Sequence, residues 1–105
     1  MAFKNSTDEN FQKQISGSKL SLIQFSASWC NPCQVLKPII EKISNDLSDK
    51  IECYYHDIEK EPNEPVKFSV KGVPTCFLFR EGKLLATKVG ATSEKDMLEW
   101  ITPHL

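Results

Sequence analysis

Short, apolar, β-prone runs alternate with helix-patterned segments along the chain, and this alternation limits the folds that are open to it. Three such runs, at residues 20–27, 51–57 and 75–80, predict buried strands. A Glu-Gly pair at 81–82 turns the third run back into residues 83–89, which indicates a hairpin. Strands that alternate with helices in this order predict an α/β domain with helices on both faces of one sheet.

The segments between the strands carry helical patterns. Residues 31–47 place apolar side chains on one broad face, although Pro38 must remove a backbone hydrogen bond there and bend the axis. Shorter helices are expected after residues 6–8 (Ser-Thr-Asp), which offer helix caps, and over residues 62–68, and a last helix from residues 92–93. The apolar face expected for the long helix comprises Val35, Leu36, Ile39, Ile40, Ile43 and Leu47.

The length and composition of the chain fit a small globular protein. Its 105 residues allow one domain, spanning residues 1–105, and 40% of them are hydrophobic, enough for one core. A net charge of −1, with acids and bases interspersed, argues against nucleic-acid binding, and no apolar run approaches the ~20 residues that span a bilayer. Residues 1–4 are expected to form an edge strand and lack the apolar stretch of a secretory signal, so we expect a cytoplasmic protein.

Four cysteines allow two structural disulfides, a metal site or redox chemistry. Cys30 and Cys33 are separated by two residues and lie between an expected strand and an expected helix. The unpaired N–H groups of the first helical turn and the helix dipole favour a thiolate there, so we expect a lowered pKa for Cys30. The same spacing brings Cys33 close enough to form a small disulfide ring with Cys30.

Two less reactive interpretations of this pair are disfavoured. A zinc site would need a second nearby pair, and the other candidate ligands are scattered singly through the chain. They are Cys53, Cys76, His56 and His104. A purely structural disulfide would remove little chain entropy from so short a loop. Pro32 fixes φ in the first turn, and Trp29 offers a flat apolar wall for a substrate peptide.

At this point the sequence resembles the thioredoxin family over essentially its whole length. The residues that carry the resemblance are 25–33 (Phe-Ser-Ala-Ser-Trp-Cys-Asn-Pro-Cys), Lys37-Pro38, 72–75 (Gly-Val-Pro-Thr), Phe79, Gly82 and 89–91 (Val-Gly-Ala). The resemblance implies the thioredoxin fold, a central mixed β-sheet flanked by helices on both faces. It also implies a protein-disulfide reductase that cycles Cys30 and Cys33 between dithiol and disulfide, without a metal or organic cofactor.

The resemblance further implies a substrate groove beside the cysteine pair. The Val73–Pro74 peptide bond is expected to be cis, which would let the backbone of Val73 pair with an extended substrate strand. Gly90 and Ala91 would form the far side of this groove, with Trp29 as its wall. The implied partners are proteins that contain disulfides, and a thioredoxin reductase or another dithiol donor that recharges the oxidised chain; a monomer is expected.

Three positions, Asn31, Gln24 and Cys53, depart from the family pattern. Asn31 stands where glycine is usual between the cysteines, and it is expected to shift the redox potential in a direction that the sequence does not give. Gln24 stands where the family typically has a buried aspartate beneath the second cysteine, and Cys53 is taken to replace that aspartate's basic companion. Glutamine cannot take up a proton at physiological pH, so we expect slower resolution of the mixed disulfide.

Three classes of function share these residues. A binding module with the same groove would not need intact cysteines on both sides of Asn31 and Pro32. An isomerase or an oxidase would differ from a reductase only in redox poise. Cys53 and Cys76 are interpreted as buried, unreactive residues, and His56 and His104 as residues that face solvent or lie at a strand end, without a role.

Overall fold

The computed structural model describes residues 3–105 and contains a five-stranded sheet in the order β1-β3-β2-β4-β5. The strands are β1 (Phe3–Ser6), β2 (Leu20–Ser26), β3 (Ile51–Asp57), β4 (Thr75–Arg80) and β5 (Lys83–Val89). The helices are α1 (Phe11–Ile15), α2 (Asn31–Asp46), α3 (Asn63–Lys67) and α4 (Glu94–Ile101), followed by a 3₁₀ turn at Thr102–His104. Strands β1, β3 and β2 run parallel, and β4 and β5 complete the sheet as an antiparallel hairpin.

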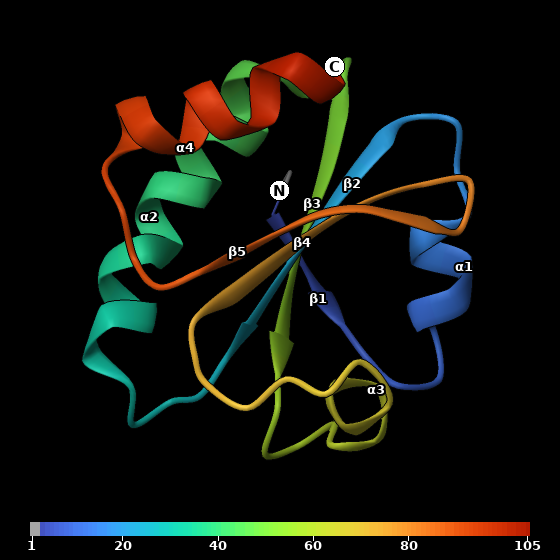
Figure 1. Ribbon diagram of the computed structural model, residues 1–105, viewed down its shortest axis with the longest axis vertical. Helices are drawn as coiled ribbons and strands as arrows, with labels where there is room; N and C mark the ends of the chain where they lie inside the picture. The colour runs from blue at the N-terminus through green and yellow to red at the C-terminus, as the bar shows by residue number, and fades with distance from the viewer. Residues whose placement is uncertain (1–2) are drawn as a thin grey trace.

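Helices cover both faces of this sheet, as the sequence predicts (Figure 1). On one face α2 and α4 pack over a core that includes Leu22, Leu36, Ile40 and Ile101. On the other face α1 encloses an aromatic cluster, in which the Phe11 ring meets those of Phe25, Phe68 and Phe79 at centroid distances of 5.6–6.1 Å. Such aromatic contacts stabilise the core beyond the burial of their area.

Strand β2 lies at the centre of the molecule and leads directly into the segment that holds the cysteine pair. All seven of its residues are buried, because β3 and β4 flank it and helices cover both of its faces. This burial explains why apolar residues of the strand point to both faces of the sheet, with Leu22 and Ile23 in sequence, rather than alternating strictly with exposed polar ones. The end of the strand, and the start of α2 after it, are therefore held in a fixed position.

The structure corrects three details of the sequence interpretation. Residues 1–2 of the expected edge strand lie outside the described residues, and the strand extends to Ser6. Val35 is 63% exposed, so it does not belong to the apolar face of α2. Asp8 does not cap the helix that follows it: its carboxylate accepts the N–H groups of Asn63 and Glu64 at 3.0 and 2.9 Å, and so caps α3.

Candidate active site

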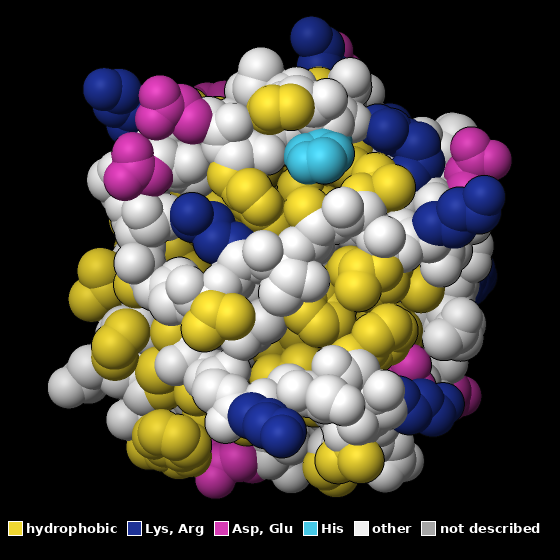
Figure 2. Space-filling model, in the orientation of Figure 1, with side chains coloured by type: hydrophobic (Ala, Val, Ile, Leu, Met, Phe, Trp, Pro, Cys, Tyr) yellow, Lys and Arg dark blue, Asp and Glu magenta, His cyan; other side chains and the backbone are white. Residues whose placement is uncertain are grey.

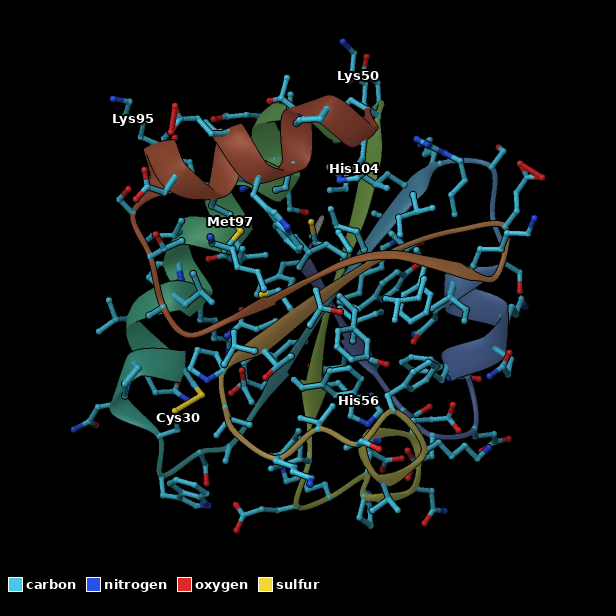
Figure 3. The ribbon with its side chains drawn as sticks, viewed as in Figure 1. Cys30, Lys50, His56, Lys95, Met97 and His104 are labelled. Carbon is cyan, nitrogen blue, oxygen red and sulfur yellow. A yellow bond between two sulfur atoms is a disulfide. The ribbon has the colours of Figure 1, made fainter. Side chains whose placement is uncertain are left out.

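Cys30 occupies the N-cap position of α2, and three residues separate it from the end of the buried strand β2 at Ser26 (Figure 3). Its sulfur accepts the backbone N–H of Cys33 at 3.2 Å, and the two cysteines form a disulfide with Cα atoms 5.2 Å apart. A first-turn N–H of α2, a helix of sixteen residues, thus points at the first sulfur. In the reduced protein, this donor and the dipole of the helix stabilise a thiolate at Cys30.

The two sulfur-bearing residues differ in their access to solvent. Cys30 retains 5% of its surface and Cys33 none, and both pack with Ala27, Ile58 and Val73 in a small apolar cluster. A substrate that approaches from solvent therefore reaches the Cys30 sulfur first. Asn31 and Pro32, between the two cysteines, are both exposed.

A second loop faces the disulfide with open backbone groups. The Val73–Pro74 peptide bond is cis, as predicted, and the Val73 carbonyl oxygen lies 3.7 Å from the Cys30 sulfur. Within residues 3–105 the Val73 N–H has no hydrogen-bond partner, whereas the Gly90 N–H is bonded to the Pro74 carbonyl at 2.8 Å. The strand before Gly90 is thereby tied to this loop, and Val73 remains open to pair with another chain.

Gln24 lies beneath the second cysteine, where the sequence interpretation placed it. Its side chain is fully buried, and its Nε2 donates to the Cys33 carbonyl at 3.1 Å and to the Ser26 hydroxyl at 2.8 Å. Its Oε1 is buried without a partner among the described residues. A neutral amide thus anchors the first turn of α2 to the central strand.

The residue opposite Gln24 on β3 is Tyr55, and this corrects the sequence interpretation, which assigned that place to Cys53. Cys53 pairs with Leu22, two residues further back along the strand. The Tyr55 hydroxyl accepts Gln34 Nε2 at 3.1 Å, and Lys37 Nζ lies 4.5 Å from the centre of its ring. The polar neighbour of Gln24 is therefore a phenol beneath a lysine rather than a thiol.

Cys53 and Cys76 are buried free thiols on strands that β2 separates. Burial raises the pKa of each thiol to about 12, and for Cys53 the nearby Ser44 hydroxyl opposes part of this increase. Because the thiolate is the reactive form, these residues are unreactive in the folded protein. The interpretation of both as packing residues agrees with this burial.

The raised thiol pKa values predict a loss of stability at alkaline pH. Below the ordinary thiol pKa of 9.0 these thiols are protonated in both the folded and the unfolded chain, so they do not change the free energy of unfolding. Above it the unfolded chain ionises first, and stability falls until the pH reaches the folded pKa of about 12. At about pH 10 each thiol should therefore lower the unfolding free energy by about 1 kcal/mol.

Urea unfolding of the wild type and of a Cys53→Ala/Cys76→Ala variant, at neutral pH and at about pH 10, measures this effect. The cavities left by alanine lower stability at both pH values and cancel in the comparison. The alkaline loss should be smaller in the variant than in the wild type. An equal loss in the two proteins would show that other groups dominate the alkaline transition.

Sequence reasoning missed a buried polar network around His56. His56 lies near the end of β3, one of the two places expected for it, but its imidazole is fully buried there and does not face solvent. Its Nδ1 lies 2.8 Å from the Ser6 hydroxyl, and its Nε2 lies 2.8 Å from the Glu61 carbonyl oxygen and 3.4 Å from a carboxylate oxygen of Asp8. Ser6 and His56 are register partners on neighbouring strands, so only the pairing of β1 with β3 reveals the contact.

The fold and the site together define a class of protein. A cysteine pair that opens a helix, with one sulfur near the surface and open backbone beside it, is suited to exchange with disulfides of extended chains. This is the chemistry of a thiol–disulfide oxidoreductase. No helix within residues 3–105 is long and apolar enough to cross a membrane.

Comparisons with known proteins agree with this class. The sequence model of the thioredoxin family matches residues 2–103. The thioredoxin of Buchnera aphidicola subsp. Acyrthosiphon pisum is 41% identical over 100 residues, which cover 94% of this chain and 93% of that protein. The thioredoxin of Rickettsia bellii is 38% identical over 102 residues, with 96% and 97% coverage. The crystal structure of Malassezia sympodialis thioredoxin superimposes with a TM-score of 0.88 at 30% identity, covering 99% of this chain and 90% of that one.

The chain therefore belongs to the thioredoxin family. It is a thiol–disulfide oxidoreductase with protein-disulfide reductase activity, and its redox-active centre is the disulfide-forming pair of cysteines described above. Disulfide-containing substrates and a reductase that returns electrons to the pair are general features of the family.

Proposed function

We propose that Cys30 is the attacking nucleophile and Cys33 the resolving cysteine of a two-step reduction of protein disulfides. In the first step the Cys30 thiolate attacks one sulfur of a substrate disulfide, forms a mixed disulfide and releases the other substrate sulfur as a thiolate. In the second step the Cys33 thiolate attacks the Cys30 sulfur, and the remaining substrate thiolate leaves. Both substrate thiolates take protons from solvent. The observation that carries this assignment is that Cys30 is the more accessible sulfur and the N-cap of α2.

The substrate chain is proposed to lie across Val73 in an extended conformation. The Val73 N–H has no partner within residues 3–105, and its carbonyl oxygen is beside the Cys30 sulfur, so both groups are placed to pair with a strand at the reacting disulfide. Trp29, which is 65% exposed, would form one wall of the groove. Gly90 and Ala91 would form the opposite side, where larger side chains would obstruct the substrate, and Pro74 would hold the loop against the cysteines.

Apolar surface next to this groove supports binding of a polypeptide rather than a small disulfide alone. Figure 2 shows hydrophobic side chains exposed on the face that carries β5. A cavity of about 370 Å³ opens there beside Gly72 and is lined by Phe68, Val70, Leu84 and Val89, among others. An apolar side chain of a substrate near its disulfide would be removed from water at this position.

The oxidised protein needs two electrons before another cycle, and we propose that a thioredoxin reductase or another dithiol donor supplies them. Net reduction of protein disulfides requires a reducing compartment, which supports a cytoplasmic location. Pro32 and Asn31 are proposed to set the redox potential of the pair, because they form the short loop that the disulfide closes.

A dithiothreitol-driven reduction of a disulfide-bonded protein tests this function, and Trp29→Ala tests the groove within the same assay. The wild type should accelerate the reduction. Trp29→Ala should raise KM for the protein substrate about tenfold, the effect typical of losing an aromatic anchor from an interface. A small disulfide, which does not extend along the groove, should react with the variant at nearly the wild-type rate.

Val66→Ala is the matched control, because Val66 is 75% exposed on α3 and, like Trp29, has little packing to lose. The variant should reduce both the protein substrate and the small disulfide with wild-type kinetics. Failure of the wild type to accelerate reduction would overturn the proposed function and leave a binding module. Equal KM values for Trp29→Ala and the wild type would show that Trp29 does not contact the substrate.

A further inference from the structure

The buried ionisable groups are distributed unequally between the two faces of the sheet. Among residues 3–105 the buried carboxylate is that of Glu64, on α3, and it is paired with Lys67 at 2.9 Å. His56 is buried among Phe11 and Phe25, on the face that α1 covers. Beneath α2 the buried ionisable side chains within the described residues are those of cysteines. They are Cys30, Cys33, Cys53 and Cys76.

Within residues 3–105, the groups that face Gln24 and Cys33 from each neighbouring element provide no proton acceptor of ordinary basicity. On β4 the register partner of Gln24 is Cys76, and burial raises the pKa of its thiol. On β3 the register partner is Tyr55; its hydroxyl accepts a hydrogen bond, and its ring lies beneath Lys37. From α2 itself the other group is Cys30. None of these is a carboxylate or an imidazole.

The amide of Gln24 is oriented by its partners. The Cys33 carbonyl oxygen can only accept a hydrogen bond, so the nitrogen of the amide must face it, and the oxygen then points elsewhere in the core. That oxygen has no partner among the described residues. Gln24 thus holds the turn that carries Cys33 through its backbone and, because an amide does not take up a proton, contributes no base.

We propose that the second step of the reaction proceeds without a protein base, and that Gln24 is a positioning residue for Cys33. This inference rests on the proposed function. Cys33 first loses its proton to solvent, and its thiolate then attacks the Cys30 sulfur of the mixed disulfide. The bond between the Cys30 and Cys33 sulfurs forms as the bond to the substrate sulfur breaks, and the released thiolate takes a proton from solvent. The rate of this step therefore follows a single ionisation, that of Cys33.

Single-turnover kinetics with a dithiobis-nitrobenzoate separates the two steps, because each releases one coloured thiolate. The first release depends on the reagent concentration and the second does not. In the wild type the second rate should rise about tenfold per pH unit from about pH 5.5 to about pH 7.5, in proportion to the thiolate fraction of Cys33.

Substitutions of Gln24 distinguish a base from a positioning residue. Gln24→Asp adds a carboxylate, so the second rate should increase about tenfold or more near pH 6 and its pH dependence should flatten at neutral pH. Gln24→Leu removes the bond to the Cys33 carbonyl without adding an ionisable group, so the second rate should fall while its slope against pH stays the same. Gln24→Asn serves as a second neutral variant and should show the same slope.

The outcomes separate this inference from the function on which it rests. A wild-type profile with a second ionisation below neutral pH, or a slope that changes in Gln24→Leu, would overturn the inference. The wild-type profile decides this even if the variants with a buried charge or a lost hydrogen bond fail to fold. A protein that releases no thiolate in the concentration-dependent phase would instead overturn the assignment of Cys30 as nucleophile.

Discussion

Cys30→Ser should abolish turnover in the dithiothreitol-driven reduction of a protein disulfide. A serine hydroxyl at this N-cap would still accept the Cys33 N–H, so the helix start and the fold should be retained. A hydroxyl does not attack a disulfide, however, and no mixed disulfide can form. We expect a loss of at least about a thousandfold, to the rate of dithiothreitol alone, because the first covalent step is missing.

Cys53→Ala provides the matched control, since it removes one of the buried free thiols and leaves the redox pair intact. It should lower stability but retain turnover. Circular dichroism and urea unfolding of Cys30→Ser should show a folded protein. Residual catalysis above the dithiothreitol background would mean that another sulfur attacks the substrate, and Cys33 or the buried thiols Cys53 and Cys76 would then have to supply it.

The location of the redox site was predictable from sequence because its determinants are local. Cys30, Pro32 and Cys33 lie within a single turn that follows an apolar strand, and the helix start, the disulfide and the order of accessibility all follow from that placement. The strand and helix order was predictable for a similar reason. The three inner strands β2, β3 and β4 each carry their own apolar residues, and Ser93 caps α4 through the N–H of Asp96 three residues away.

Contacts between segments distant in sequence were predictable only where the family resemblance supplied them, as for Val73 beside Cys30. Asp8 caps α3 across more than fifty residues, and Ser6 meets His56 through the parallel pairing of β1 with β3. The register of β2 against β3 likewise decides that Tyr55, and not Cys53, lies opposite Gln24. A shift in register changes every such neighbour, and the sequence of one strand does not name its partner residues on the next.

The exposure of Val35 illustrates a different limit. The apolar residues of α2 extend around more of the helix than the sheet and α4 can cover, so periodicity alone includes a residue that the packing leaves out. Val35 is two residues after Cys33 and stays exposed. An apolar surface residue of this kind is compatible with a protein that must contact others, although single exposed apolar side chains are also common in stable monomers.

Cys33→Ser should convert the enzyme into a trap for its substrates. The first step needs only Cys30 and should proceed at nearly the wild-type rate, because Cys33 contributes its backbone N–H, which serine retains, to the Cys30 sulfur. The second step has no attacking sulfur, so a mixed disulfide with Cys30 should accumulate to about one equivalent instead of resolving within the assay. Non-reducing mass spectrometry of the intact adduct measures its yield.

The position of the trapped sulfur tests whether Cys30 attacks and Cys33 resolves. Proteolysis of the adduct should place the substrate on Cys30, and added dithiothreitol should release it at the rate of ordinary exchange in solution. Cys33 is fully buried while Cys30 keeps some surface, so the reverse pairing, a substrate held on Cys33 in a Cys30→Ser variant, should form slowly if at all. Equal trapping by the two variants would contradict the division of roles, because it would mean that the order of accessibility does not decide which sulfur attacks first.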